Sequence, residues 1–348
     1  MESLRRLRNG APVAFLTQIA GGSAIVPLEA FTEDRPAPGR ALRKAAAPTL
    51  VQLPASAGRS LAGTARVLLR ACRPRQWSKN LLVFAAPAAA GWIDRPEIAA
   101  EAAGALVVLC MISSATYLVN DVRDREQDRE HPRKRLRPVA AGELSPRAAL
   151  WAAAALAVGG IALASAIAPG LGALACGYLA LTAGYSLWLR RVAVLDILVV
   201  AAGFVIRALA GGVATDIYLS RWFVIVTACC AIFLVAAKRY AELRAHSGSG
   251  PARATLRRYS LGRLRLALAL SATPAAVAYA AWAFTRPDHL VWYGVSIVPL
   301  VLWLGRYSTL IGYGAGQAPE ELILRDRALL ALGVAWGVLF LGGVYVGS

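Results

Sequence analysis

A short acidic pattern follows the second long apolar run of this chain. Asn120, Asp121, Asp124 and Asp128 have the spacing N-D-x-x-D-x-x-x-D. If a helix continues past the apolar run, offsets of three and seven residues place the three carboxylates on one face. Closely spaced oxygen ligands suit Mg²⁺, which completes its shell with water and phosphate oxygens. We therefore predict that the three aspartates bind Mg²⁺ and that Asn120 contacts the substrate, although a solvated helix end with i,i+4 ion pairs has a similar composition.

A basic loop comes next in the sequence. The stretch HPRKRLRP, residues 131–138, presents Arg133, Lys134, Arg135 and Arg137 between two prolines. Arginine suits bidentate contacts with phosphate, and lysine supplies a point charge. Part of this charge is of the kind found in any cytoplasmic loop. We predict that Lys134 and Arg137 bind substrate, so that a metal site beside a phosphate clamp indicates a phosphorylated or diphosphate substrate.

One later apolar segment carries both a carboxylate and a guanidinium. Asp196 lies near its start, and Arg207 follows eleven residues later, so the two share a helical face. A charge at that depth costs several kcal/mol unless it faces a polar cavity or a partner. We expect Arg207 to bind substrate, with a structural ion pair inside the bundle as the alternative.

A weaker signal ends the following apolar segment. The stretch AAKRYAEL, residues 236–243, places Lys238, Arg239 and Glu242 where they could reach the same site. Basic residues at helix ends are also common because they extend toward the membrane surface. We predict Lys238 as a substrate-binding residue.

The composition places these motifs in a polytopic membrane protein. Of the 348 residues, 57% are hydrophobic, and the mean hydropathy is +0.53. Such values are typical of membrane proteins. We predict an all-α bundle of about nine transmembrane helices. The nine apolar segments run approximately over 79–94, 98–119, 147–168, 170–189, 193–213, 220–239, 264–285, 290–311 and 327–346.

The distribution of basic residues predicts the orientation of the chain. Of the 38 lysines and arginines, 34 lie before the first segment or in the connections on one side of the membrane. Only Arg95, Arg221 and Arg286 lie on the other side. The positive-inside rule then places the N-terminus and the acidic motif in the cytoplasm, in a multi-pass protein of the plasma membrane. The same rule explains the net charge of +18 without a nucleic-acid partner.

The N-terminal residues have a different composition. We expect residues 1–65 to form a weakly structured extension, and residues 66–348 to form the transmembrane catalytic domain. The apolar stretch 11–28 is short, contains glycines and lacks an A-x-A-like cleavage site, so we expect neither a signal peptide nor a span there. The five cysteines lack metal-ligand spacing and are expected to be small core residues.

Four stretches of the sequence resemble the UbiA superfamily of intramembrane prenyltransferases, and in particular its phosphoribosyl-transferring branch. The resemblance covers about residues 68–346 and implies a UbiA-like bundle. It also implies that Asp121, Asp124 and Asp196 are catalytic. Further substrate-binding residues that it implies are Lys79, Tyr185 and Arg190. The stretches that carry it are RPRQWSKNLLVFAAP, NDVRDREQDREHPRKRLRP, LDILVVAAGFVIRALAGG and KRYAEL.

One departure distinguishes the branches of this superfamily. Ordinary prenyltransferases usually have a second motif, D-x-x-x-D, but here Val192 and Val200 stand four residues on either side of Asp196. The resemblance therefore implies that 5-phosphoribose 1-diphosphate is the donor, that a polyprenyl (decaprenyl) phosphate in the lipid bilayer is the acceptor, and that Mg²⁺ is the cofactor. A prenyltransferase acting on an aromatic or haem acceptor is the closer alternative, and a transporter or lipid-binding protein is the more distant one.

Overall fold

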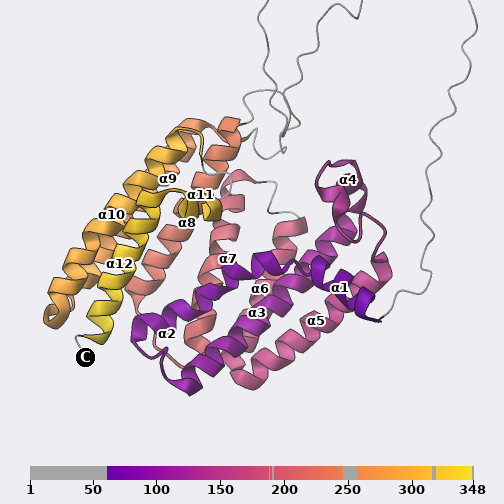
Figure 1. Ribbon diagram of the computed structural model, residues 1–348, viewed down its shortest axis with the longest axis horizontal. Helices are drawn as coiled ribbons and strands as arrows, with labels where there is room; N and C mark the ends of the chain where they lie inside the picture. Colours follow the sequence, from indigo (N-terminus) through magenta and orange to yellow (C-terminus); the bar gives the residue numbers. More distant parts are fainter. Residues whose placement is uncertain (1–60, 188, 190–191, 246–257, 316–318, 347–348) are drawn as a thin grey trace, which may run out of the picture. The chain divides into compact units, whose positions relative to one another are not determined.

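A computed structural model describes residues 61–187, 189, 192–245, 258–315 and 319–346. Every regular element among these residues is helical, as the sequence predicts (Figure 1). The first element begins at Leu61, inside the expected N-terminal extension, whose residues 1–60 lie outside the described residues. In chain order the elements are α1 (Leu61–Ala71), the 3₁₀ helix η2 (Pro74–Phe84), α2 (Ala85–Ala90), α3 (Pro96–Arg123), α4 (Arg125–Glu130), the 3₁₀ turn η3 (Lys134–Leu136), α5 (Pro146–Ile167), α6 (Pro169–Leu187), α7 (Ala193–Ala214), α8 (Arg221–Ala245), α9 (Leu261–Phe284), the 3₁₀ turn η6 (Pro287–His289), α10 (Leu290–Gly312), α11 (Pro319–Arg325) and α12 (Arg327–Tyr345).

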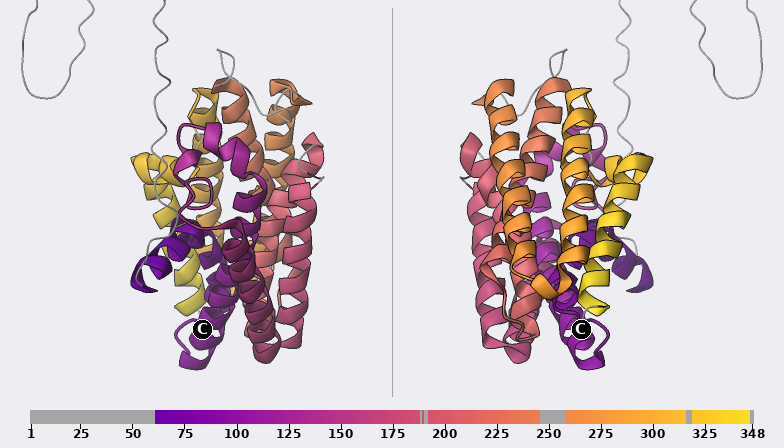
Figure 2. Two further views of the ribbon diagram at one scale, coloured as in Figure 1. Left: turned by 90° about the vertical axis from the view of Figure 1, so that its right-hand side faces the viewer. Right: turned by 90° about the vertical axis from the view of Figure 1, so that its left-hand side faces the viewer.

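Eight of the described helices are long and apolar enough to cross a membrane. They are α3, α5, α6, α7, α8, α9, α10 and α12. Figure 2 shows these helices running side by side in a bundle. Large apolar side chains such as Trp151 and Val291 are 78% and 77% exposed on its outside. An apolar outer surface on a helical bundle is typical of a protein surrounded by lipid.

The expectation of one long helix over residues 79–94 is wrong. The segment is divided between η2 and α2, and α2 ends at Ala90, where Gly91 caps it with a φ of 72°. The two short helices nevertheless cross the bundle together. Arg73, before η2, contacts Asp121 near the end of α3, whereas Gly91 lies against Val344 near the end of α12. This pair therefore adds one crossing to those of the eight long helices in the described chain.

Helix α7 lies between the apolar cores of the bundle. One core joins α7 to α8, α9, α10 and α12 and contains the ring pair of Phe233 and Tyr307, whose centroids are 5.7 Å apart. A second core joins α7 to η2, α3, α5 and α6. A Cβ atom on Gly211 of α7 would lie 1.8 Å from the carbonyl oxygen of Val83 in η2. Only glycine permits this close approach, which fixes η2 against α7.

Several helices begin at side-chain caps that the local sequence supplies. The Ser145 and Ser260 hydroxyls accept hydrogen bonds from the third amide that follows, at 3.2 Å, and open α5 and α9. The carboxylate of Asp326 does the same for the amide of Leu329 at 2.9 Å and opens α12. Such caps satisfy amides that have no partner inside the helix. The starts of these three helices are therefore determined locally.

Candidate active site

The acidic pattern lies at the junction of α3 and α4. Asp124 separates the two helices, so the expected continuous helix is interrupted by a single residue. The amide of Asp124 donates to the carbonyl of Asn120, and the amide of Asp128 donates to the carbonyl of Asp124, both at 2.9 Å. The backbone therefore keeps a nearly helical path, which brings the first and last aspartates to the same side. Figure 1 shows α4 at the opposite end of the bundle from the end of α12.

Asp121 and Asp128 share one guanidinium. The Nη1 atom of Arg137 lies 3.2 Å from Oδ1 of Asp121 and 2.6 Å from Oδ2 of Asp128. Both aspartates are buried. The ammonium group of Lys134 lies 3.9 Å from the other oxygen of Asp128. The structure thus places the two cations chosen from the basic loop beside the first and last carboxylates of the acidic pattern.

Arg73 is a second guanidinium at Asp121, and the sequence did not indicate it. Its Nη2 atom donates to Oδ1 of Asp121, and its guanidinium lies 5.0 Å from the ring centroid of Tyr117. The other oxygen of Asp121, Oδ2, is buried and accepts no hydrogen bond from any described residue. A buried carboxylate oxygen with unused lone pairs fits a hard cation such as Mg²⁺.

The third aspartate of the pattern has a different contact. Oδ1 of Asp124 accepts hydrogen bonds from Nε and Nη2 of Arg123, both at 3.1 Å. Within the described ranges, no three acidic, histidine or cysteine side chains gather closely enough to form a metal cage. The acidic pattern therefore offers two buried carboxylates, those of Asp121 and Asp128, and Mg²⁺ commonly binds one or two carboxylates of a protein.

Two further predicted residues lie on neighbouring elements. Lys79 is on η2, and its Nζ atom lies 3.5 Å from Oε1 of Gln76. Asn120 is half-buried in the last turn of α3, next to Asp121. Neither residue contacts the two shared carboxylates through a hydrogen bond that the described structure records. Their roles toward substrate therefore stay predictions.

Asp196 is the centre of a second buried polar cluster. Arg239 donates from Nε to Oδ2 at 2.6 Å and from Nη2 to Oδ1 at 2.9 Å. The hydroxyls of Tyr185 and Tyr259 donate to Oδ1 at 2.7 Å and to Oδ2 at 3.1 Å. Four donors use the lone pairs of both oxygens, so the geometry suits positioning of these side chains better than metal binding.

Tyr259 donates to this carboxylate as a neutral phenol. Burial and the neighbouring Asp196 raise its pKa above the ordinary value of 10.0. A negative charge beside a phenol disfavours the phenolate, so the hydroxyl keeps its proton. The sequence offered no signal for Tyr259, because it lies sixty-three residues after its partner.

The end of α8 presents Arg239 to this cluster, one residue after the predicted Lys238. Nη1 of Arg239 also donates to Oε2 of Glu242 at 2.7 Å. One residue corresponds to a rotation of about 100° around a helix, so Lys238 points elsewhere and is half-buried. The predicted Arg190, which would flank Tyr185, lies outside the described residues.

Arg207 is buried inside the bundle among neutral acceptors. It donates from Nε to Oδ1 of Asn80 at 2.8 Å, from Nη1 to the carbonyl of Gly203 at 2.6 Å and from Nη2 to the hydroxyl of Tyr178 at 2.6 Å. Its guanidinium lies 4.9 Å from the Tyr178 ring centroid. In the part of the chain that the structure describes, its acceptors carry no charge, and Asp196 on the same helix pairs with Arg239 instead.

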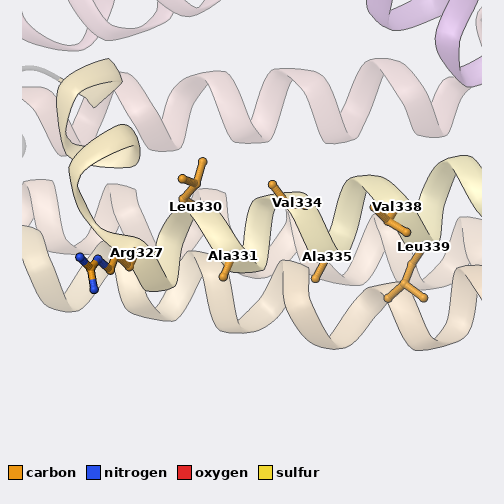
Figure 3. Close-up of a pocket in the computed structure, with 7 residues that line it drawn as sticks. All are labelled: Arg327, Leu330, Ala331, Val334, Ala335, Val338 and Leu339. Atoms are coloured by element: carbon orange, nitrogen blue, oxygen red, sulfur yellow. The ribbon is translucent and has the colours of Figure 1, made fainter.

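A surface pocket lies on α12, apart from both polar clusters. Figure 3 shows all its lining side chains on this one helix, which is among the least buried of the long helices. Most of them are aliphatic, as expected for the outer face of a membrane helix. The lining residues are Arg327, Leu330, Ala331, Val334, Ala335, Val338 and Leu339.

Comparison with known families agrees with the helical bundle. The model of the UbiA prenyltransferase family matches residues 81–331. The chain belongs to the UbiA family. This UbiA-family chain is a multi-pass membrane protein, consistent with the eight helices of spanning length among its described residues.

Curated relatives of this UbiA-family protein share most of its length. It is 43% identical over 275 residues to the decaprenyl-phosphate phosphoribosyltransferase of Mycobacterium tuberculosis (strain CDC 1551 / Oshkosh), covering 77% of this chain and 91% of the relative. The decaprenyl-phosphate phosphoribosyltransferase of Corynebacterium glutamicum is 42% identical over 289 residues, covering 80% and 87%.

A solved structure with the same fold comes from a more distant relative. A UbiA homolog from Archaeoglobus fulgidus bound to DMAPP and Mg²⁺ superposes with a TM-score of 0.61, covering 80% of this chain and 98% of that chain. Its sequence identity is 18%, so the likeness shows the shared fold alone.

Proposed function

We propose that this UbiA-family protein transfers the 5-phosphoribosyl group from 5-phosphoribose 1-diphosphate to decaprenyl phosphate, with release of diphosphate. The relatives named decaprenyl-phosphate phosphoribosyltransferase support this activity through their 42–43% identity over most of the chain. One structural observation carries the proposal: Arg137 and Lys134 lie against the buried Asp121 and Asp128. Such a mixed cluster can hold a metal ion and a diphosphate side by side.

Asp121 and Asp128 are the proposed Mg²⁺ ligands. Oδ2 of Asp121, which accepts no hydrogen bond from the residues that the structure describes, supports this assignment. When bound, Mg²⁺ would supply positive charge to the donor diphosphate and stabilise it as a leaving group. Asp124 remains a third candidate ligand because it lies between the other two in sequence, although its carboxylate would first have to leave Arg123.

The basic side chains at the same end would bind the phosphate groups. Lys134 and Arg137 already lie beside the metal-binding carboxylates. Lys79 and Asn120 are on elements next to the site and are proposed as further contacts to the donor. Their positive and polar groups would orient the diphosphate and hold C1 of the ribose toward the acceptor.

The reaction itself requires no protein nucleophile. An oxygen of the lipid phosphate is already anionic, and it would form the new bond to C1 of the ribose as the bond from C1 to the diphosphate oxygen breaks. The protein would contribute by positioning and by charge stabilisation. Asp196 would act as a positioning residue that holds Arg239, Tyr185 and Tyr259 for contact with the ribose or the lipid phosphate.

The proposed site faces the cytoplasm of a plasma membrane. The excess of lysine and arginine in the connections on the side of the acidic motif supports this orientation. A soluble donor could then enter from the cytoplasm, while the lipid acceptor keeps its chain in the bilayer. The product would be a phosphoribosylated lipid of the kind needed for cell-wall arabinan precursors.

Donor competition in purified membranes tests this proposal. Radiolabelled 5-phosphoribose 1-diphosphate and a labelled prenyl diphosphate are offered separately with decaprenyl phosphate and Mg²⁺, and the label is followed into lipid. We expect Mg²⁺-dependent transfer of ribose phosphate. Consumption of the prenyl diphosphate alone, with an aromatic acceptor present, would instead establish a prenyltransferase.

A further inference from the structure

Arg73 has a backbone conformation that is unfavourable for a residue with a side chain. Its φ and ψ are 56° and 63°, in the left-handed region. Among the described residues other than glycine, only Asp216 shares a positive φ. Such a conformation persists where the surroundings require it, and it commonly marks a functional position.

The neighbours of Arg73 are fastened to α3. The Ser114 hydroxyl accepts a hydrogen bond from Nε1 of Trp77 at 3.2 Å and donates to the carbonyl of Cys72 at 3.3 Å. One buried serine thereby holds the chain on both sides of Arg73. These two hydrogen bonds maintain the turn between α1 and η2 and direct the Arg73 side chain toward the end of α3.

The side chain ends at a proposed metal ligand. Its guanidinium contacts Asp121 and lies beside the ring of Tyr117, and the side chain is 24% exposed. Arg137 contacts both Asp121 and Asp128, whereas the carboxylate that Arg73 contacts in the described structure is Asp121 alone. Arg73 therefore contacts fewer carboxylates than Arg137 does, and it should be the more easily released of the two when a metal ion binds Asp121.

We propose that Arg73 is an exchangeable counter-ion of the metal site. It neutralises Asp121 in the substrate-free protein and moves to a phosphate oxygen of the donor when Mg²⁺ takes the carboxylate. The identity of that donor rests on the proposed function, whereas the competition for Asp121 does not.

Charge balance explains why such an exchange is needed. A buried carboxylate without a counter-ion is strongly unfavourable. In the metal-free protein Asp121 shares Arg137 with Asp128, and Arg73 completes its neutralisation. Mg²⁺ on Oδ2 of Asp121 and the Arg73 guanidinium on Oδ1 would repel each other, and this repulsion favours release of the arginine. The donor brings anionic phosphate oxygens, which a guanidinium binds with paired hydrogen bonds.

The exchange predicts opposite effects on the binding of metal and donor. Removal of Arg73 removes a competitor for Asp121, so the metal alone should bind more tightly. The same change removes a phosphate contact, so the donor should bind more weakly. A purely structural role would weaken both affinities or leave both unchanged.

Metal and donor binding to the purified full-length protein test the proposal. Mn²⁺, a paramagnetic ion that also prefers oxygen ligands, is titrated by electron paramagnetic resonance without donor. The affinity for radiolabelled 5-phosphoribose 1-diphosphate is then measured with Mn²⁺ present. Arg73→Gly keeps the left-handed backbone without a Cβ. Arg70→Gln is the matched control, since this exposed residue lies three positions earlier and pairs with Glu143 at 2.9 Å.

For Arg73→Gly we expect Mn²⁺ to bind about tenfold more tightly and the donor about tenfold more weakly, each equivalent to one lost charge interaction. Arg70→Gln should change either affinity by less than about twofold. Arg73→Lys, which keeps the cation, should retain near-wild-type Mn²⁺ affinity and still weaken donor binding, because lysine lacks the paired donors. This second variant decides the question if the glycine variant does not fold.

Two outcomes would count against this proposal, and a third would count against the proposed function. Equal Mn²⁺ affinities in Arg73→Gly and Arg70→Gln would overturn the competition for Asp121. Tighter Mn²⁺ binding with unchanged donor affinity would overturn the movement to phosphate. A wild-type protein that binds Mn²⁺ but not the donor would contradict the proposed function, while the Mn²⁺ titration would still decide the role of Arg73.

Discussion

Arg239 on α8 and Asp196 on α7 form a buried ion pair with two parallel hydrogen bonds. The distances are 2.6 Å from Nε to Oδ2 and 2.9 Å from Nη2 to Oδ1, and both side chains are less than one-tenth exposed. Desolvation of the two charges offsets much of their attraction, so the pair adds little net stability. Loss of one partner, however, leaves a buried charge without its counter-ion.

Arg239→Met should destabilise the protein by about 3–5 kcal/mol, because it leaves Asp196 unpaired. The double variant Asp196→Leu/Arg239→Met should recover much of this loss and remain inactive. Thermal unfolding in detergent measures the stability. Glu242→Gln is the control, since it weakens one contact of Arg239 and keeps the pair itself. An Arg239→Met variant as stable as Glu242→Gln would contradict the structural role of the pair.

Asp121→Asn should lower turnover at saturating Mg²⁺ by at least about a hundredfold, because it weakens charge stabilisation at the reacting diphosphate. Asp124→Asn should cost less, about tenfold, and excess Mg²⁺ should partly restore its activity. The measurement is Mg²⁺-dependent transfer of phosphoribose into lipid. Glu126→Gln, at an exposed site on α4, is the control. Near-wild-type turnover of Asp121→Asn would exclude Asp121 as a metal ligand.

Asn80→Leu should destabilise the protein by about 1–3 kcal/mol, because the Nε atom of Arg207 loses its acceptor inside the bundle. Ser113→Ala is the matched control, since Ser113 contacts the amide of Asn80 at 3.4 Å without touching Arg207. Chemical unfolding of both variants in detergent gives the comparison. Equal stability of the two variants would mean that Arg207 finds another acceptor.

Asp326 should make stability depend on pH at the start of α12. Hydrogen bonds from Arg306 and from the amide of Leu329 lower its pKa below the ordinary value of 3.8. A lowered folded pKa stabilises the protein above the unfolded pKa, and this stabilisation is lost as the pH falls through the folded value. Asp326→Asn should therefore unfold at a lower temperature than the wild type at pH 7, and the difference should shrink below about pH 3.8.

Thermal unfolding of both proteins at pH 7 and pH 3 provides the measurement. Arg306→Gln should show a smaller but similar trend, since it removes the 2.8 Å ion pair and keeps the cap on Leu329. A difference between wild type and Asp326→Asn that stays constant with pH would mean that the charge of Asp326 does not stabilise the junction.

The spacing of residues predicted those parts of the site whose members lie close together in the sequence. Asp121 and Asp128 are seven residues apart, and Arg137 and Lys134 follow within the same connection, so the sequence contained both halves of the cluster. Tyr185 and Asp196 likewise lie close in sequence and in space. The helical bundle followed from the length and number of the apolar segments.

Contacts between distant segments could not be predicted from the sequence. Arg73 contacts Asp121, which lies forty-eight residues later, because the backbone at Arg73 is left-handed. No sequence pattern predicts this conformation for an arginine. The choice between Lys238 and Arg239 depended on the rotation of α8 about its axis, which its packing against α7 determines. The break between η2 and α2 was missed because hydropathy is insensitive to the type of helix.

The 3₁₀ form of η2 also determines how far the first crossing extends. A 3₁₀ helix rises about 2.0 Å per residue and an α-helix about 1.5 Å. The 11 residues of η2 and the 6 of α2 therefore extend about 31 Å, close to the thickness of the hydrocarbon layer, which is about 30 Å. If η2 were rewound as an α-helix, the crossing would shorten by about 5 Å. The 3₁₀ geometry therefore lets this short segment extend from the contact of Arg73 with Asp121 to the approach of Gly91 to Val344.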